Sequence, residues 1–464
     1  MAKSQIQAIS ENGRKTVKTD DIPNYSCKNG KKILIIRDRV VLAQISNYKE
    51  ITMQDKDTTQ STFMQLFQPI FSKKIWANIH REVPELDKRV QKLKTSQLTL
   101  LISNAQLQEY RALRKISTSV NSDQFSRSIG LESISHSQIS RRLRTLPIKV
   151  SEMLFKHLLN KIAQKKGFGF IQQRLGKLYM IDASIISLCL SQYPWARFRK
   201  TKAGIKMHLR LSFDGMALPD EVIITPAKTA DKKKLDELIV VDLDVLNIFD
   251  RGYVDYRLFD EYCKKGIFFV TRLKDNAVVE FIGERPIEEN SPIEEDVDVI
   301  LGTNSRKMEH KLRVITIDDS VNEPFSIVTN DFNRSAEEFG EIYRYRWQIE
   351  LFFKWLKQHA QIKHFYGTSE TAVINQLLLA LMTYCTLILL KLEVKYERDL
   401  LTMQRTVIAC LFESYHSFLK KLRRRKAKGS RRVDNKLLYR LTEHQVLNEE
   451  TDWLNDLTYD PLFL

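Results

Sequence analysis

Apolar residues between positions 61 and about 166 recur at spacings of three and four, which is the period of an amphipathic helix. Phe63, Leu66 and Phe67 show this spacing clearly. We therefore predict an all-α segment there. Within it, Ser135 is a plausible helix N-cap, and the Arg-rich residues that follow it up to Pro147 have the profile of a helix-turn-helix recognition helix. An ordinary surface helix would have the same pattern.

The middle of the chain changes to the two-residue period of β-strands. The sequence predicts the order βββαβαβ, with the turn Asp214-Gly215 joining the second and third strands. These elements are expected at residues 177–182, 206–213, 221–225, 231–240, 245–249, 256–265 and 267–270. Three antiparallel strands followed by parallel strands and helices form the ribonuclease-H-like α/β arrangement, in which the first and fourth strands lie side by side.

The remaining sequence favours a β-rich insertion, one long helix over residues 335–360 and a buried helix over residues 372–390. The last of these stretches has no charge and approaches membrane-spanning length, but Asn375 and Gln376 interrupt it, so we predict a core helix. The predicted division begins with an unassigned extension (1–60) and an α-helical DNA-binding domain (61–170). The catalytic core follows in two parts (171–274 and 335–392), separated by the β-rich insertion (275–334). A basic helical C-terminal region (393–464) ends the chain.

Composition narrows the classes of partner. With 464 residues the chain should form two or three domains, and 74 Lys and Arg against 57 Asp and Glu give a net charge of +17. Such a field favours polyanions, although a solvated basic surface gives the same count. The five cysteines form no CxxC pair, and the first 14 residues hold no apolar signal core, so we expect a cytoplasmic protein without a membrane segment.

Three acidic residues are candidates for metal-dependent chemistry. Asp182 and Asp250 follow predicted strands, and Glu350 lies in the predicted long helix. Phosphodiester chemistry needs divalent ions, commonly two, and Mg²⁺ or Mn²⁺ takes oxygen ligands from rigid elements. Each acid also has an ordinary explanation: Asp182 could cap a helix, Asp250 could belong to a turn, and Glu350 could be solvated.

The residues around these acids resemble a known family. Residues 343–357 match the Y-x2-R-x3-E-x6-K signature of the YREK group of insertion-sequence transposases, relatives of the transposon-five enzyme, at Tyr343, Arg346, Glu350 and Lys357. The segments 250–253 (DRGY) and 181–184 (IDAS) are similar to those around the family's second and first acids, and 367–369 to a segment that follows the signature. The resemblance covers roughly residues 61–390.

The resemblance implies roles for these residues. Asp182, Asp250 and Glu350 would be catalytic and bind Mg²⁺ or Mn²⁺, while Tyr343 and Arg346 would contact phosphate near a transposon end. Lys357 would contact DNA. The spacing of the four signature residues places them on one face of a helix, and a guanidinium and an ammonium suit phosphate contacts.

Further candidates for DNA contact lie in basic segments. Trp195, Arg199 and Lys202 belong to a basic stretch interrupted by aromatic residues, which suits a DNA channel or a solvated loop. Arg141 and Arg142 lie on the candidate recognition helix. Arg424 and Arg425 belong to a basic run from Lys420 to Arg432 that would bind phosphates without reading sequence.

Two further polar residues of the predicted core are expected to have supporting rather than metal-binding roles. We expect His208 to be a core or supporting histidine rather than a ligand, and Asp231 to be an N-cap rather than a fourth metal acid.

The sequence as a whole predicts a bacterial insertion-sequence transposase. It would cleave transposon ends and join their 3′-hydroxyls to target DNA, in the cytoplasm and associated with the nucleoid when bound to DNA. The resemblance alone implies that it acts as a homodimer on paired ends. The alternatives are a domesticated nuclease and a catalytically inactive DNA-binding protein on the same fold. The sequence of the terminal repeats, the target preference and the excision route are not encoded in these patterns.

Overall fold

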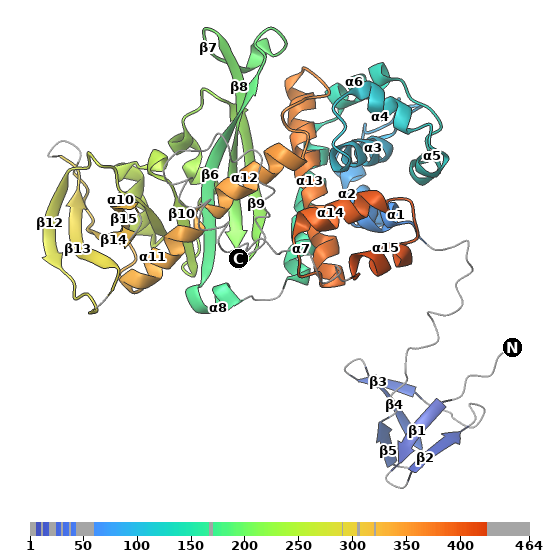
Figure 1. The fold of residues 1–464 in the computed structure, drawn as a ribbon, viewed down its shortest axis with the longest axis horizontal. Coiled ribbons are helices and arrows are strands. Elements are labelled where there is room, and N and C mark those ends of the chain that lie inside the picture. Colours follow the sequence, from blue (N-terminus) through green and yellow to red (C-terminus); the bar gives the residue numbers. More distant parts are fainter. Residues whose placement is uncertain are drawn as a thin grey trace, which may run out of the picture. The chain divides into compact units, whose positions relative to one another are not determined.

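The computed structural model describes residues 60–166, 170–289, 291–303, 307–319 and 322–424, together with five strands closer to the amino terminus (Figure 1). The chain divides into two compact units, Met1–Gln60 and Ser61–Leu464.

The first unit contains two small antiparallel sheets, one of two strands and one of three. The apolar runs at residues 32–36 and 40–42 lie in the larger of these sheets. The five strands are β1 (Ile6–Ser10), β2 (Gly13–Val17), β3 (Tyr25–Lys28), β4 (Lys31–Ile36) and β5 (Arg39–Leu42).

The second unit begins with the predicted run of helices. Ser135 caps the sixth of them in a capping box with Gln138, as its position in the sequence predicts. The helices are α1 (Thr62–Phe67), α2 (Lys73–Glu82), α3 (Thr95–Leu107), α4 (Leu113–Ser119), α5 (Asp123–Ile129), α6 (His136–Thr145), α7 (Ile148–Lys165) and α8 (Phe170–Leu175).

One long helix, α13 (Glu370–Val394), forms the centre of this helical part. It contacts α3, α6 and α7, and also the later helix α14 (Leu400–Ala409). The last helix, α15 (Tyr415–Leu422), contacts α14 (Figure 1). Its length and composition would allow it to cross a membrane, but 94% of its most apolar window is buried inside the protein. The prediction of a core helix is confirmed.

A ten-stranded mixed sheet forms the other part of this unit. Its strand order is β12-β13-β14-β15-β11-β10-β6-β8-β7, and β9 also pairs with β8. The strands are β6 (Lys177–Leu188), β7 (Arg197–Arg199), β8 (Lys202–Phe213), β9 (Ala217–Pro226), β10 (Val245–Phe249), β11 (Phe268–Arg272), β12 (Val279–Glu284), β13 (Ile293–Leu301), β14 (Leu312–Asp319) and β15 (Asn322–Thr329).

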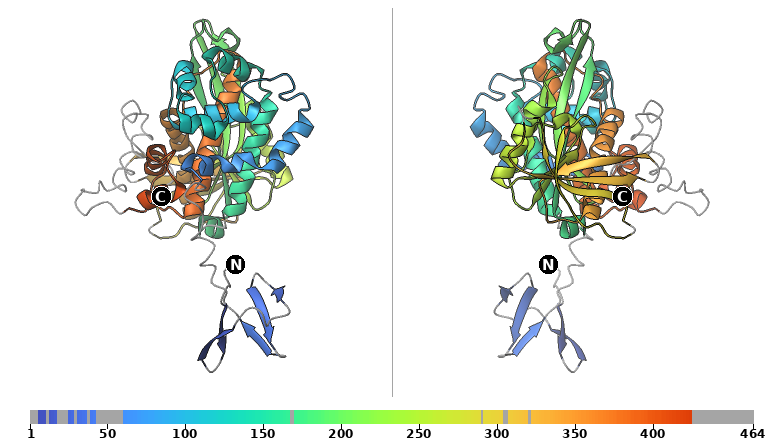
Figure 2. Two further views of the ribbon diagram at one scale, coloured as in Figure 1. Left: turned by 90° about the vertical axis from the view of Figure 1, so that its right-hand side faces the viewer. Right: turned by 90° about the vertical axis from the view of Figure 1, so that its left-hand side faces the viewer.

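The first and fourth strands of the predicted core, β6 and β10, lie side by side and parallel. The prediction that β6 ends at residue 182 is wrong, because β6 continues to Leu188 in a long antiparallel pair with β8. This hairpin projects beyond the rest of the sheet in Figures 1 and 2. Asp182 therefore lies where β6 leaves β10, not where β6 ends.

Two predicted helices are interrupted. In place of a helix over 231–240, the chain forms the short 3-10 helix η4 (Asp231–Lys234) and one turn of α-helix, α9 (Leu235–Leu238). The expected helix over 335–360 is two helices, α11 (Ala336–Tyr345) and α12 (Gln348–His359). Around Arg346 and Trp347 the backbone closes bonds between residues three apart, which tightens the turn and separates the two helices.

A buried amide fastens α13 to the early helices. The Asn375 side chain donates to the backbone carbonyl of Leu146 at 2.8 Å and accepts from the Ser151 hydroxyl at 2.7 Å. Both side chains are buried, so neither bond can be replaced readily by water.

We predict that Asn375→Ala destabilises the protein by about 1–3 kcal/mol, the cost of leaving buried polar groups without partners. Urea unfolding followed by circular dichroism would measure the change. Asn276→Ala, at an exposed position, is the matched control and should change the midpoint little. Equal midpoints for the two variants would contradict the role assigned to Asn375.

Candidate active site

Asp182 and Asp250 are adjacent across two parallel strands. The last register pair of β6 and β10 is Ile181 with Phe249, so each acid is the next residue of its strand. Both side chains are partly buried. The Asp182 carboxylate accepts the N–H of Ala183 at 2.7 Å within a strand, which excludes the helix-capping explanation.

Asp250 does cap a turn, but the turn is built around its carboxylate. It precedes the 3-10 helix η5 (Arg251–Tyr253) and accepts the N–H of Gly252 at 2.9 Å. A Cβ atom at Gly252 would lie 3.0 Å from an Asp250 carboxylate oxygen, so a larger residue would push the acid aside. The capping function and the predicted site position are compatible.

Glu350 approaches the same place from the first turn of α12, which packs on β6. Its carboxylate forms an ion pair with Arg346 at 2.6 Å, and its side chain is 33% exposed against 17% for the arginine. Glu350 and Asp250 both raise the pKa of Asp182. The three predicted acids are therefore brought into one electrostatic cluster.

Burial and the charge of Arg346 are the two largest influences on the pKa values of the two aspartates. Burial raises the pKa of Asp182 to about 7; Arg346 opposes this change, and the neighbouring acids add to it. The pKa of Asp250 is also raised by burial, against the effect of Arg346. For Arg346, burial alone would lower the pKa, but Glu350, Tyr343 and Asp182 together hold it above its usual range.

The cluster contains the carboxylate groups that a divalent-metal site needs, but these groups are not arranged as ligands of one ion. Carboxylate oxygens are the ligands that Mg²⁺ and Mn²⁺ prefer. Within the described residues, no three His, Cys, Asp or Glu side chains are arranged so that they could hold a metal ion. Arg346 interacts with each of the three acids. Metal binding would therefore require the carboxylates and the guanidinium to rearrange.

The other signature residues border this cluster. Tyr343 is 9% exposed, its ring lies 5.8 Å from the Arg346 guanidinium, and burial raises its pKa. Burial lowers the pKa of Lys357, Lys363 adds to this effect, and Asp182 opposes it. Tyr343 therefore lies beside the guanidinium that pairs with Glu350, and the charge of Lys357 acts on Asp182.

Lys354 is a candidate that the sequence analysis missed. Its ammonium is buried without a hydrogen-bond partner among the described residues, and burial lowers its pKa. It follows Glu350 by one helical turn, so the i to i+4 spacing on the signature helix could have identified it.

A second polar cluster contains Asp231, whose predicted role as an N-cap is wrong. Ala230 is the N-cap of η4, and Asp231 instead pairs with Lys206 at 2.9 Å and lies 3.6 Å from His208. His208 is fully buried and lies 3.0 Å from the Thr225 hydroxyl, as expected for a supporting histidine. Asp231 raises the pKa of Asp250, so this cluster acts electrostatically on the acids.

Three residues near the tip of the basic hairpin are predicted to contact DNA, and two of them are exposed. Arg199 and Lys202 are exposed at the tip formed by β7 and β8. Trp195 is not an exposed stacking residue: its indole N–H donates to the Thr368 carbonyl at 2.7 Å, and its ring packs against the core. These contacts give Trp195 a structural role in the free protein, and its contact with DNA stays a prediction.

On α6 the two predicted arginines differ. Arg141 is exposed, whereas the side chain of Arg142 is only 16% exposed. Arg142 pairs with Asp87 at 2.7 Å and also donates to the Leu93 carbonyl and the Thr95 hydroxyl. Arg142 therefore has a structural role in the free protein, and its contact with DNA stays a prediction.

The basic C-terminal run is described only at its start. Arg424 is exposed after α15, whereas Arg425 and the rest of the run lie outside the described residues.

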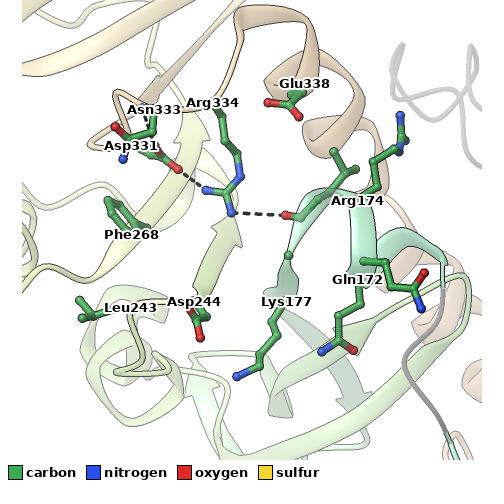
Figure 3. A pocket seen from close by; sticks show the side chains of 13 residues that line it. Gln172, Arg174, Lys177, Leu243, Asp244, Phe268, Asp331, Asn333, Arg334 and Glu338 are labelled. Carbon is green, nitrogen blue, oxygen red and sulfur yellow. Dashed lines mark hydrogen bonds and ion pairs between the residues drawn. The ribbon is translucent and has the colours of Figure 1, made fainter.

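A cavity of about 580 Å³ lies at the opposite end of β6 and β10 from the acids (Figure 3). Arg334 crosses it, paired with Asp331 and donating to the Leu175 carbonyl at 3.3 Å. Lys177 at its edge pairs with Asp242. The bond between Arg334 and Leu175 joins α8 to the segment that follows β15. The cavity is separate from the candidate active site.

The part of the chain that contains the three acids is similar to known transposases. Residues 174–386 match the family model described as "Transposase DDE domain". The chain is 26% identical over 264 residues to a protein named "Probable transposase for insertion sequence element IS5377" from Geobacillus stearothermophilus, covering 56% of this chain and 68% of that protein. It is 31% identical over 227 residues to a candidate transposase, y4zB, of Sinorhizobium fredii, covering 47% and 62%.

A third relative is a candidate transposase for insertion sequence element IS4SA from Synechocystis. It is 24% identical over 303 residues, which cover 63% of this chain and 82% of the relative.

We predict that Asp182→Asn changes how stability depends on pH in the presence of EDTA. Because the pKa of Asp182 is about 7 when folded and 3.8 ordinarily, the folded protein holds a proton that the unfolded chain releases between these values. Wild-type stability should therefore fall as pH rises from about 4 to about 7. The Asn variant should be more stable at pH 8 by on the order of 1–3 kcal/mol, a figure reduced for partial solvent screening.

Urea midpoints from pH 4 to pH 8 would measure this difference. Asp123→Asn, at a side chain that is 85% exposed, is the control and should give no such trend. A parallel pH dependence for wild type and Asp182→Asn would show that burial of this carboxylate is not costly.

We also predict that Arg142→Ala lowers stability by about 1.5–3 kcal/mol, because it removes hydrogen bonds to a charged group. Its neighbour Arg141→Ala should leave the unfolding midpoint nearly unchanged, since Arg141 is exposed. Thermal or urea unfolding of the two variants side by side tests the structural role of Arg142. Equal stability of the two variants would contradict that role.

Proposed function

We propose, from the transposase DDE domain that residues 174–386 carry, that this protein is a transposase that cleaves the ends of a bacterial insertion sequence and joins their 3′-hydroxyls to target DNA. The observation that carries the proposal is the meeting of Asp182, Asp250 and Glu350 in one cluster. They come from two parallel strands and a crossing helix. The YREK subgroup remains a resemblance.

The strand order supports a ribonuclease-H-like core. The antiparallel strands β9, β8 and β6 are followed in the sheet by the parallel strands β10 and β11, with α10 (Tyr256–Lys265) between the last two in sequence. We assign residues 171–274 and 335–392 to this core and 275–334 to its β-rich insertion. α13 also packs on the early helices, so this core shares its interior with residues 61–170.

In the proposed mechanism Asp182, Asp250 and Glu350 would hold Mg²⁺ or Mn²⁺, and the chemistry that such ions would supply is activation of an attacking oxygen and stabilisation of a leaving one. Arg346 offers a planar fork to a phosphate of the DNA end, and Tyr343 lies beside that fork. The ammonium groups of Lys354 and Lys357, on the same helix, supply further positive charge for the DNA backbone. The chain thus positions the scissile phosphate over the acids.

Other basic surfaces suit the remaining DNA contacts. Arg141 on α6 is exposed for end recognition, and Arg199 and Lys202 extend from the projecting hairpin. Arg424 begins the basic C-terminal run. We propose that two copies act together on paired ends, in the bacterial cytoplasm where the DNA lies.

We predict that Asp182→Asn, Asp250→Asn and Glu350→Gln each reduce Mg²⁺-dependent cleavage by about 10²-fold or more, because bound metal contributes several kcal/mol of transition-state stabilisation. Binding to an end duplex in EDTA, where no bound metal is coupled to it, should stay within about twofold of wild type, since carboxylates hold metal rather than DNA. Single-turnover cleavage and gel-shift binding on the same duplex would measure both quantities.

Asp242→Asn, at an acid near the other end of the same two strands, is the control and should cleave normally. Near-native cleavage by any one of the three variants would remove that residue from the site. A strand-transfer assay with precut ends completes the test: cleavage without joining would favour the nuclease alternative.

A further inference from the structure

We propose that Arg346 is an internal counter-cation that occupies the acidic cluster in the free protein and competes with the divalent metal, so that metal binds tightly only after a DNA phosphate has drawn the guanidinium away. This inference rests on the proposed function, because it assumes that the acids are metal ligands. It adds a second role for Arg346, a residue expected until now only to contact phosphate.

The contacts of Arg346 place its charge among the acids. Its Nη2 atom donates to a Glu350 carboxylate oxygen at 2.6 Å, in a pair whose arginine side chain is 17% exposed. It also stabilises the ionised forms of Asp182 and Asp250. The guanidinium thus contacts one of the three carboxylates and acts through its charge on the other two. No other described Arg or Lys forms an ion pair with any of the three.

The neighbouring cations are engaged elsewhere or face no acid. Arg251, next to Asp250, pairs instead with Asp275 at 3.2 Å. Arg272 lies over the Phe325 ring at 5.6 Å. Lys354, one turn beyond Glu350, has no hydrogen-bond partner among the described residues. Arg346 is therefore the residue whose removal would leave the acids without a paired cation.

The same contacts explain why a ready-made metal site is not found among the described residues. Glu350 is turned toward Arg346, four residues earlier, at the junction of α11 and α12. A metal ion that recruits Glu350 must break this pair. A divalent ion and the guanidinium therefore compete for the same oxygen atoms.

A phosphate can resolve this competition, because a guanidinium fork binds phosphate as well as it binds carboxylate. When a DNA end supplies that phosphate, the acids are released to the metal. By thermodynamic reciprocity, metal must then tighten end binding by the same factor. The free protein would hold metal weakly and would be slow to cut DNA that does not present a phosphate at this position.

The test is the affinity of the full-length protein for Mn²⁺, measured without DNA by electron paramagnetic resonance of the free ion. Arg346→Ala should bind Mn²⁺ about tenfold or more tightly than wild type, because a unit positive charge within about 4 Å of the ion's ligands has been removed. Arg346→Lys keeps the charge and should stay near wild type. Arg344→Ala, an exposed arginine two residues away, is the matched control and should not change the affinity.

Adding an end duplex should separate the variants further. Wild-type affinity for Mn²⁺ should rise about tenfold or more with the duplex, whereas that of Arg346→Ala should change several-fold less, because no guanidinium remains to be displaced. If Arg346→Ala binds Mn²⁺ no more tightly than wild type, or gains as much from DNA, the competition does not exist.

Asp182→Asn and Glu350→Gln distinguish failure of this inference from failure of the proposed function. Loss of Mn²⁺ binding in both, with unchanged affinity in Arg346→Ala, would overturn the counter-cation role alone. Mn²⁺ binding that none of the acidic variants alters would place the metal elsewhere and overturn both proposals.

Discussion

Carboxylates held close together in a partly buried place are costly, because burial disfavours their charges and like charges repel, and the arrangement around the acidic cluster depends on this constraint. Three carboxylates meet where β6 leaves β10 and where α12 crosses them. Side chains on flexible loops would move apart under such repulsion. Rigid strands, a glycine beside Asp250 and a buried helix keep them together, and Arg346 offsets part of the cost.

The position of Glu350 depends in turn on the packing between α12 and α13. The Tyr384 ring lies 4.9 Å from Phe352 and 4.8 Å from Trp355, in edge-on contacts that favour aromatic rings. These contacts fix the rotation of α12, and so the direction in which its acid points. Asn375 and its partners hold α13 on the early helices. The helical part of the protein is therefore also the support of the acidic cluster.

Much of this arrangement follows from local pattern. The alternation around Asp182 and Asp250 and the spacing of the signature predicted that strands and a helix carry the acids, and the parallel pairing of β6 and β10 places them together. Contacts between distant segments were beyond such patterns. Arg142 is taken up by Asp87, 55 residues away, and Trp195 by Thr368, 173 residues away. The break at Arg346 depends on a tightened turn in a segment whose periodicity is helical throughout.

The helix at the centre of the helical part, α13, is synthesised long after the early helices that contact it. The helices α1, α3 and α6 leave the ribosome long before Val394, the last residue of α13, which all three contact. At about 5–20 residues per second, the interval between Thr145 and Val394 corresponds to roughly ten to fifty seconds. During that time the early helices can pack on one another, but the apolar surfaces that α13 later covers have no partner. This part of the protein therefore completes its packing late in synthesis, and a ribosome-bound chaperone has time to bind it first.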